Sequence, residues 1–224
     1  LVNLGHGLSE ANLWGVRSKQ EVIARLQAAE AQLAPGQWLI GRGWDQNLWP
    51  EKTFPSAADL DAAFPDRPLY PDRVDGHAAW VNSAALRIAQ AHGRSLAGHW
   101  HPDGGRIERD AAGQPTGVLI DAAAGLVSAH IPAHAPEELD RRLERALQLA
   151  VANGLTGVHD MGVSREELAR FARFADAGKL PLRVDAYADG DGQALADLCR
   201  EGLYRHPGGR LQMRGVKLFV DGAL

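Results

Sequence analysis

The feature that most constrains the fold is the regular alternation of helix and strand patterns after residue 131. Residues 135–154 carry Leu or Val at every fourth position and end in Asn-Gly, which predicts an amphipathic helix. The strand-like stretch LTGVHDMG follows, then a helix pattern over 164–179, a strand pattern over 180–189 and a further helix from about 192 to 201. Short connections between alternating helices and strands are typical of a parallel α/β sheet or barrel.

Residues 37–130 do not show this rhythm. QWLIGRGW reads as a strand, and GGRIERDAAGQPTGVLID predicts a hairpin that turns around Gly113. Short helices are expected after Ser56 and from the Asn82 region onward, and a Ser18–Glu21 capping box predicts a helix from residue 18.

The composition excludes several classes of protein. A formal net charge of −4 over 224 residues gives no basic footprint for nucleic acid, and no apolar run is long enough to cross a bilayer. The single cysteine, Cys199, excludes an internal disulfide and fits a reducing, cytoplasmic setting.

The strand in GVKLFVDGAL combines an apolar set with charged residues. Val216, Leu218 and Val220 alternate with Lys217, Phe219 and Asp221, and the aliphatic set suits a helix layer, so Lys217 and Asp221 should point into a barrel. One interpretation is a buried ion pair between these two side chains. The other is an uncharged lysine that takes up carbon dioxide, forming a carbamate that could bridge two cations.

Two polar residues end the strand in LTGVHDMG. His159 and Asp160 are consecutive, so one faces the interior and the other packs outward or into the following loop. Because active sites of α/β proteins lie at the carboxyl ends of the strands, either residue could be a ligand, a substrate contact or a helix cap.

The loop DGHAAWVNSAAL carries His77, Trp80 and Asn82 just before a predicted helix. It could clamp a small polar ligand, or it could be a turn whose Asp and Asn cap the backbone. Trp44 and Asp45 lie in GRGWDQNLWP, which could form a lid over a pocket or the core of a small subdomain.

Five segments together resemble one family: GRGWDQNLWP, DGHAAWVNSAAL, GGRIERDAAGQPTGVLID, GLTGVHDMG and GVKLFVDGAL. They are similar to amidohydrolase family 3, which includes exoenzyme regulatory proteins and N-substituted formamide deformylases. The resemblance implies a partial (β/α)8 TIM barrel of the metal-dependent hydrolase type with an inserted α+β subdomain. Residues 1–36 would be a barrel segment, 37–130 the insertion, and 131–224 the β/α units of strands two to four.

The resemblance also implies roles for individual residues. Lys217 falls at the position of the family's metal-bridging carboxylated lysine, His77 at a loop residue that reaches toward the substrate, and Asp160 at a polar residue ending the second strand. Asp160 and His77 are therefore the expected catalytic residues. Substrate contacts are expected from a further set: Trp44, Asp45, Trp80, Asn82 and His159.

The expected reaction is attack of metal-activated water on an amide or formamide carbonyl of a small molecule, with one or two divalent ions, zinc being the expected metal. The family's H-x-H would lie before Leu1, and its later histidines and catalytic aspartate after Leu224. The chain is therefore expected to be an inactive fragment without bound metal, whose exposed strand edges favour a homo-oligomer. The alternatives are a non-catalytic regulatory protein on the same fold and a folding domain without activity of its own.

Overall fold

The structure, a computed structural model, describes residues 1–93, 95–190 and 192–218. It divides into two compact units: one contains Leu1–Leu8 and His134–Leu224, and the other contains Ser9–Ala133. We call the first the β/α unit and the second the inserted unit. The inserted unit thus begins at Ser9, whereas the sequence predicted that residues 9–36 belong with the barrel.

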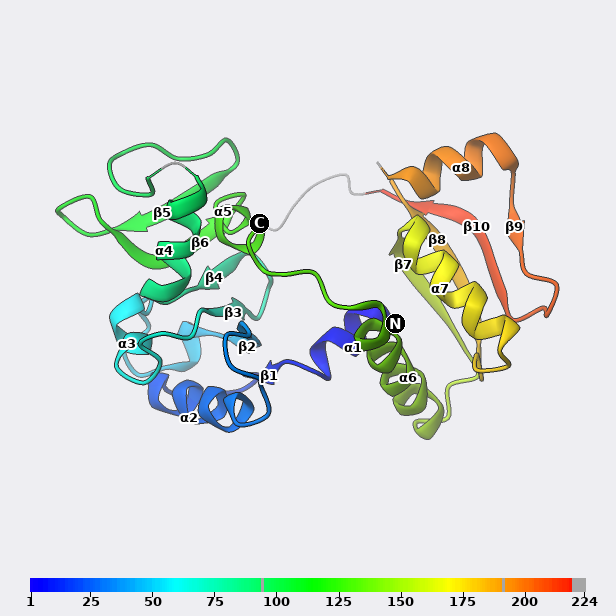
Figure 1. Cartoon of the computed structure of the whole chain (residues 1–224), viewed down its shortest axis with the longest axis horizontal. Coiled ribbons are helices and arrows are strands. Elements are labelled where there is room, and N and C mark those ends of the chain that lie inside the picture. Colours follow the sequence, from blue (N-terminus) through cyan, green and yellow to red (C-terminus); the bar gives the residue numbers. More distant parts are fainter. Residues whose placement is uncertain (94, 191, 219–224) are drawn as a thin grey trace. The chain divides into compact units, whose positions relative to one another are not determined.

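The inserted unit contains a six-stranded sheet in the order β1-β2-β3-β4-β6-β5 (Figure 1). The first three strands are parallel and the remaining pairs are antiparallel. The strands are β1 (Ala11–Asn12), β2 (Leu39–Trp44), β3 (Leu69–Arg73), β4 (Ala78–Trp80), β5 (Gly105–Arg109) and β6 (Pro115–Asp121). The helices are α2 (Lys19–Glu30), the 3-10 turn η1 (Gln46–Leu48), α3 (Ala57–Asp61), α4 (Ser83–His92) and α5 (Gly125–Ser128).

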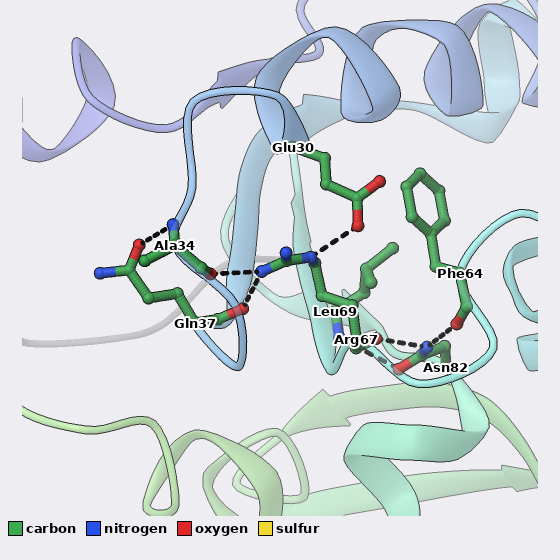
Figure 2. Close-up of polar contacts among 7 residues, drawn as sticks. All are labelled: Glu30, Ala34, Gln37, Phe64, Arg67, Leu69 and Asn82. Carbon is green, nitrogen blue, oxygen red and sulfur yellow. Dashed lines mark hydrogen bonds and ion pairs between the residues drawn. The ribbon is translucent and has the colours of Figure 1, made fainter.

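Residues 9–36 belong to the inserted unit because they share its sheet and its core. β1 pairs with β2, and Val22 and Leu26 of α2 are fully buried in the same cluster as Trp44. The Arg67 guanidinium also fixes the chain at the end of α2. It donates to the Glu30 carboxylate at 2.6 Å and to the backbone carbonyl of Gln37 at 2.6 Å (Figure 2). These contacts group residues 9–36 with the inserted unit, whereas the boundary at residue 37 was expected from the family resemblance.

Helix starts follow the capping signals with one difference. The Ser164 and Glu167 box at the start of α7 (Arg165–Asp176) is complete. At α2, Ser18 Oγ accepts the Glu21 backbone N–H at 3.1 Å, but the Glu21 carboxylate accepts from the backbone N–H of Arg17 rather than from Ser18. The predicted reciprocal box is therefore only half formed.

The β/α unit contains a four-stranded sheet in the order β7-β8-β10-β9 (Figure 1). The strands β7, β8 and β10 are parallel, and the short β9 runs antiparallel to β10. The strands are β7 (Gly157–Val163), β8 (Arg183–Asp189), β9 (Tyr204–Arg205) and β10 (Leu211–Lys217). In addition to α7, the helices of this unit are α1 (Val2–Gly7), α6 (Pro136–Ala152) and α8 (Gln193–Glu201).

One face of this sheet is covered by helices. Val184, Ala186 and Ala188 of β8 form one core with Leu143 of α6 and Phe171 of α7. The strand β7 lies at the edge of the described sheet, and Met161 is 44% exposed. Among the described residues, no helix has the length and apolar character that a membrane span requires.

Candidate functional site

The face of the β/α sheet opposite its helices gathers polar residues of three parallel strands. In register, His159 of β7 lies beside Asp185 of β8, and Asp185 lies beside Gln212 of β10. Nearer the carboxyl ends, Lys217 lies beside Asp189. Partners in register point to the same side of a sheet, so these side chains share one face, which we call the polar face.

A β-bulge in β10 decides which side Lys217 takes. β10 has one extra residue, Arg214, between the Met213–Ala186 and Gly215–Tyr187 pairs. Without it, simple alternation would put Lys217 on the helix-covered side with Leu211 and Met213, which are both 1% exposed. Sequence reasoning therefore reached the correct side for Lys217 without detecting the bulge that makes it possible.

The second bulge lies in β7. Gly162, with a φ of +73°, is the extra residue between the Met161–Tyr187 and Val163–Ala188 pairs. The extra residue of a bulge often adopts the left-handed conformation, which glycine reaches without steric cost. Both neighbours of β8 thus bend at the same level, near the carboxyl end, where α/β proteins carry their chemistry.

The centre of the polar face is an interconnected group. His159 Nε2 lies 3.4 Å from Asp185 Oδ2, and the other oxygen of Asp185 accepts a hydrogen bond from Gln212. The Tyr187 ring contacts His159 edge-on with centroids 5.9 Å apart. A Cβ on Gly215 would lie 2.5 Å from ring atoms of Tyr187, so position 215 must be glycine for the ring to lie there.

Sequence reasoning missed Asp185, Tyr187 and Gln212, although part of the signal was present. The strand RVDAYAD alternates Val, Ala and Ala with Asp, Tyr and Asp, the pattern of a strand with one apolar and one polar face. The apolar positions 211, 213 and 216 are spaced by two and then by three, which is the mark of an extra residue in the strand.

Asp160 lies on the opposite face. It is in register with Ala186, a core residue. The structure therefore does not bring Asp160 beside Lys217 or His159. The ion pair predicted between Lys217 and Asp221 stays a prediction, because Asp221 lies outside the described residues.

In the inserted unit, His77 is held by two carboxylates. Its Nδ1 lies 2.6 Å from Asp121 Oδ1, and its backbone N–H donates to Asp75 Oδ1 at 3.0 Å. Arg73 Nε donates to the same oxygen of Asp75 at 3.1 Å. Burial acts to raise the pKa of Asp75, but the hydrogen bond from His77 and the Arg73 guanidinium outweigh it and hold the pKa below its ordinary value.

Asn82 has a structural place. It is fully buried, and its side chain makes four hydrogen bonds. Oδ1 accepts from the backbone N–H of Leu69, and Nδ2 donates to the carbonyls of Phe64 and Arg67 (Figure 2). Oδ1 also accepts from the backbone N–H of Ala85. The expected contact of Asn82 with a substrate has no support here, because the amide has no hydrogen-bonding capacity left.

The other three residues expected to bind substrate also have internal partners. Trp44 and Trp80 are fully buried with ring centroids 6.1 Å apart, and their Nε1–H groups donate to the carbonyls of Pro71 and Ser56. Asp45 caps η1 by accepting the Asn47 backbone N–H at 2.9 Å. Of the two alternatives for this loop, the structure favours the core of a small subdomain over a lid.

The described residues do not assemble a metal site by themselves. Among them, no group of three or more His, Cys, Asp or Glu side chains converges as a metal would need. Lys217 is half-buried on the polar face and could supply one ligand as a carbamate. The donor set in this part of the chain is therefore incomplete, and no reaction step can be derived through a metal from these residues alone.

Asp72 of β3 is the described carboxyl group with the most perturbed titration. Burial raises the pKa of Asp72 to about 6, the nearby Glu10 charge adds to the rise, and Arg42 opposes it. Arg42 is its register partner on β2.

Asp72 makes a testable contribution to the pH dependence of stability. Its pKa is higher in the folded than in the unfolded state, so the folded state binds the proton more tightly, and stability falls as pH rises from about 4 to about 6. We expect Asp72→Asn to be more stable than the native protein by up to about 2 kcal/mol at pH 7.5 and to lose this advantage at pH 4. Denaturant unfolding at both pH values measures it, with the exposed Asp66→Asn as the control. An equal difference at both pH values would contradict the assignment.

Comparison with known proteins defines the class. Residues 3–224 match the model of the amidohydrolase family, and the chain belongs to that family. The sheet of parallel β/α units is accordingly part of a (β/α)8 barrel of the metal-dependent hydrolase type, and the α/β fold class expected from the sequence is confirmed, with the inserted unit as its α+β subdomain.

Three similar proteins illustrate the match. The chain is 32% identical to the Bacillus subtilis protein YtcJ over 99% of this chain and 42% of the relative, and 32% identical to an N-substituted formamide deformylase of Arthrobacter pascens over 91% and 38%. A crystal structure of an uncharacterized metal-dependent hydrolase from Pyrococcus horikoshii superposes with a TM-score of 0.68 and 25% identity, covering 99% of this chain and 41% of that one. The chain thus spans about two-fifths of the length of these proteins.

Proposed function

We propose that this chain is part of a metal-dependent hydrolase that cleaves an amide or formamide C–N bond. The observation that carries the proposal is the register of three parallel strands, which puts Lys217, His159, Asp185 and Tyr187 on one face, with the bulge in β10 turning Lys217 to that side. Family membership and the similarity to a formamide deformylase support this reaction class.

In this proposal Lys217 is the metal-binding residue. Its neutral amine attacks carbon dioxide, an N–C bond forms, and the released proton goes to solvent, leaving a carbamate anion. A divalent metal, zinc being our expectation, would supply a water of lowered pKa as the nucleophile. The remaining ligands would come from outside the described residues, since these do not form a complete set.

The other residues of the polar face would orient the substrate. Asp185 lies 3.4 Å from Nε2 of His159, and the Tyr187 ring packs against the same imidazole, so Nδ1 of His159 would contact the substrate. His77 is proposed as a second substrate contact.

The first test is metal content combined with hydrolysis. The complete gene product, purified with zinc and bicarbonate, is expected to hold about one or two metal ions per chain and to hydrolyse members of a panel of formamides and secondary amides. Chelation should abolish turnover, and metal addition should restore it. A protein that binds no metal and hydrolyses no amide would contradict the proposal and favour the non-catalytic regulatory alternative.

A further inference from the structure

His77 and Asp121 are joined through both side chain and backbone. The 2.6 Å contact between Nδ1 and Oδ1 is accompanied by a 2.9 Å hydrogen bond from the Asp121 backbone N–H to the His77 carbonyl. The two residues continue the antiparallel ladder of β4 and β6, in which Ala78 pairs with Ile120. The sheet therefore fixes the separation of the imidazole and the carboxylate.

Asp121 adopts an unusual backbone conformation. Its φ is +49°, in the left-handed region, where an Asp costs about 1 kcal/mol relative to an ordinary conformation. Conformations of this kind persist where the surrounding structure imposes them, often at functional positions. At this position the strand ends, and the Asp121 side chain meets the His77 ring.

Among the described residues, no other charged side chain forms a hydrogen bond with the side chains of this pair. Arg73, the nearest cation along the chain, donates to Asp75 instead. Among the described residues, the only side-chain partner of the Asp121 carboxylate is the His77 ring, and Nε2 of that ring makes no hydrogen bond. The side chains are 42% and 47% exposed, so a ligand can reach the imidazole from solvent.

We propose that Asp121 is a positioning residue that holds His77 in the tautomer protonated on Nδ1, so that Nε2 is presented as a hydrogen-bond acceptor. A carboxylate accepts but cannot donate, so the nitrogen facing it must carry the proton, and the lone pair is then on the other nitrogen. This inference rests on the proposed function in one respect: the hydrogen bond that Nε2 accepts is donated by the N–H of the amide substrate. The site would thus favour primary and secondary amides, including N-monosubstituted formamides, over tertiary amides.

Nitrogen-15 NMR of the imidazoles near pH 8 tests the tautomer directly, and the chain contains its own references. Nδ1 of His206 accepts the Gly208 N–H at 3.1 Å, and Nδ1 of His101 accepts the Ile107 N–H at 3.1 Å, so both of these rings must be protonated on Nε2. His77 is expected to show the opposite pattern, with the proton on Nδ1. An Nε2-protonated His77 in the native protein would overturn the proposal.

Two variants isolate the carboxylate without demanding a new backbone conformation. Gly adopts the left-handed region freely and Asn tolerates it, so Asp121→Gly and Asp121→Asn should both keep the fold, as their unfolding midpoints will show. Asp121→Gly is expected to turn His77 into a mixture of tautomers, and Asp121→Asn to weaken the preference. The matched control, Asp176→Asn, should affect the His206 signals alone, because Asp176 contacts His206 Nε2 at 3.0 Å. A His77 ring still fully protonated on Nδ1 in Asp121→Gly would overturn the proposal.

A kinetic measurement separates this inference from the proposed function. With the metal-loaded gene product, kcat/KM for a secondary amide should exceed that for its N-methylated analogue by at least about tenfold, and Asp121→Gly should reduce this ratio toward one. An unchanged ratio in Asp121→Gly would overturn the acceptor role. If no amide is hydrolysed at all, the proposed function fails, while the NMR measurement still decides whether Asp121 controls the tautomer.

Discussion

Replacing Lys217 by alanine in the metal-loaded gene product is expected to remove bound metal and lower hydrolysis by about a thousandfold or more. The half-buried amine lies on the polar face at the end of β10, in register with Asp189. A carbamate on this nitrogen would be lost together with the side chain. Metal per chain by elemental analysis and kcat/KM on the best amide are the two readouts.

Lys217→Arg separates the two interpretations of this lysine. Arginine keeps the positive charge, so it would preserve an ion pair, but it cannot form the carbamate and should lose metal as completely as alanine does. Lys179→Ala is the matched control, because Lys179 is exposed and its ammonium pairs with Glu144 at 2.9 Å. Full metal content and turnover in Lys217→Arg would show that the residue serves as an ion-pair partner.

Replacing Asn82 by alanine is expected to have the largest effect on stability, about 4 kcal/mol. The change leaves two buried N–H groups, a buried carbonyl and a partly buried carbonyl without their Asn82 partner. Three of these four bonds are drawn in Figure 2. Each unsatisfied buried group costs roughly 1–3 kcal/mol, and partial relaxation or entry of water reduces the sum. The expected loss is therefore one of folding rather than of substrate affinity.

Tryptophan fluorescence can follow this unfolding in one part of the molecule. All six tryptophans lie between Ser9 and Ala133, so their emission reports on the inserted unit alone. The control is Asn153→Ala, since Asn153 makes a single exposed side-chain hydrogen bond, to the carbonyl of Leu149. If Asn82→Ala instead unfolded like the native protein but bound substrate weakly, the structural assignment of this residue would be wrong.

The sequence predicts the local elements of this chain well because their signals are local. The box at Ser164, the four-residue spacing through α6 and the turn at Gly113 each depend on neighbouring residues. The hairpin of β5 and β6 accordingly forms as predicted.

The functional assignments depended on contacts between distant parts of the chain, which a pattern does not contain. DGHAAWVN places His77, Trp80 and Asn82 within six residues, yet only the His77 side chain is exposed, because Trp80 of β4 packs in the core and Asn82 is the buried N-cap of α4. Likewise His159 and Asp160 are equivalent in the sequence, and only the register with β8 decides which of them joins the polar face. The contact between Asp121 and His77 could not be predicted from the sequence pattern, because 44 positions separate the two residues.

The bulge at Arg214 divides β10 into a part that packs in the core and a part that carries Lys217. Before it, the pleat of β10 is set by Leu211 and Met213, which must fill the core against the helices. After it, the pleat restarts with Gly215 beneath the Tyr187 ring and Lys217 beside Asp189. Repacking the first half can therefore change how firmly the sheet is held without rotating Lys217 away from its face. The alternation of side chains therefore differs between the two halves of the strand. Substitutions in the second half can change the polar face while the packing of Leu211 and Met213 is kept.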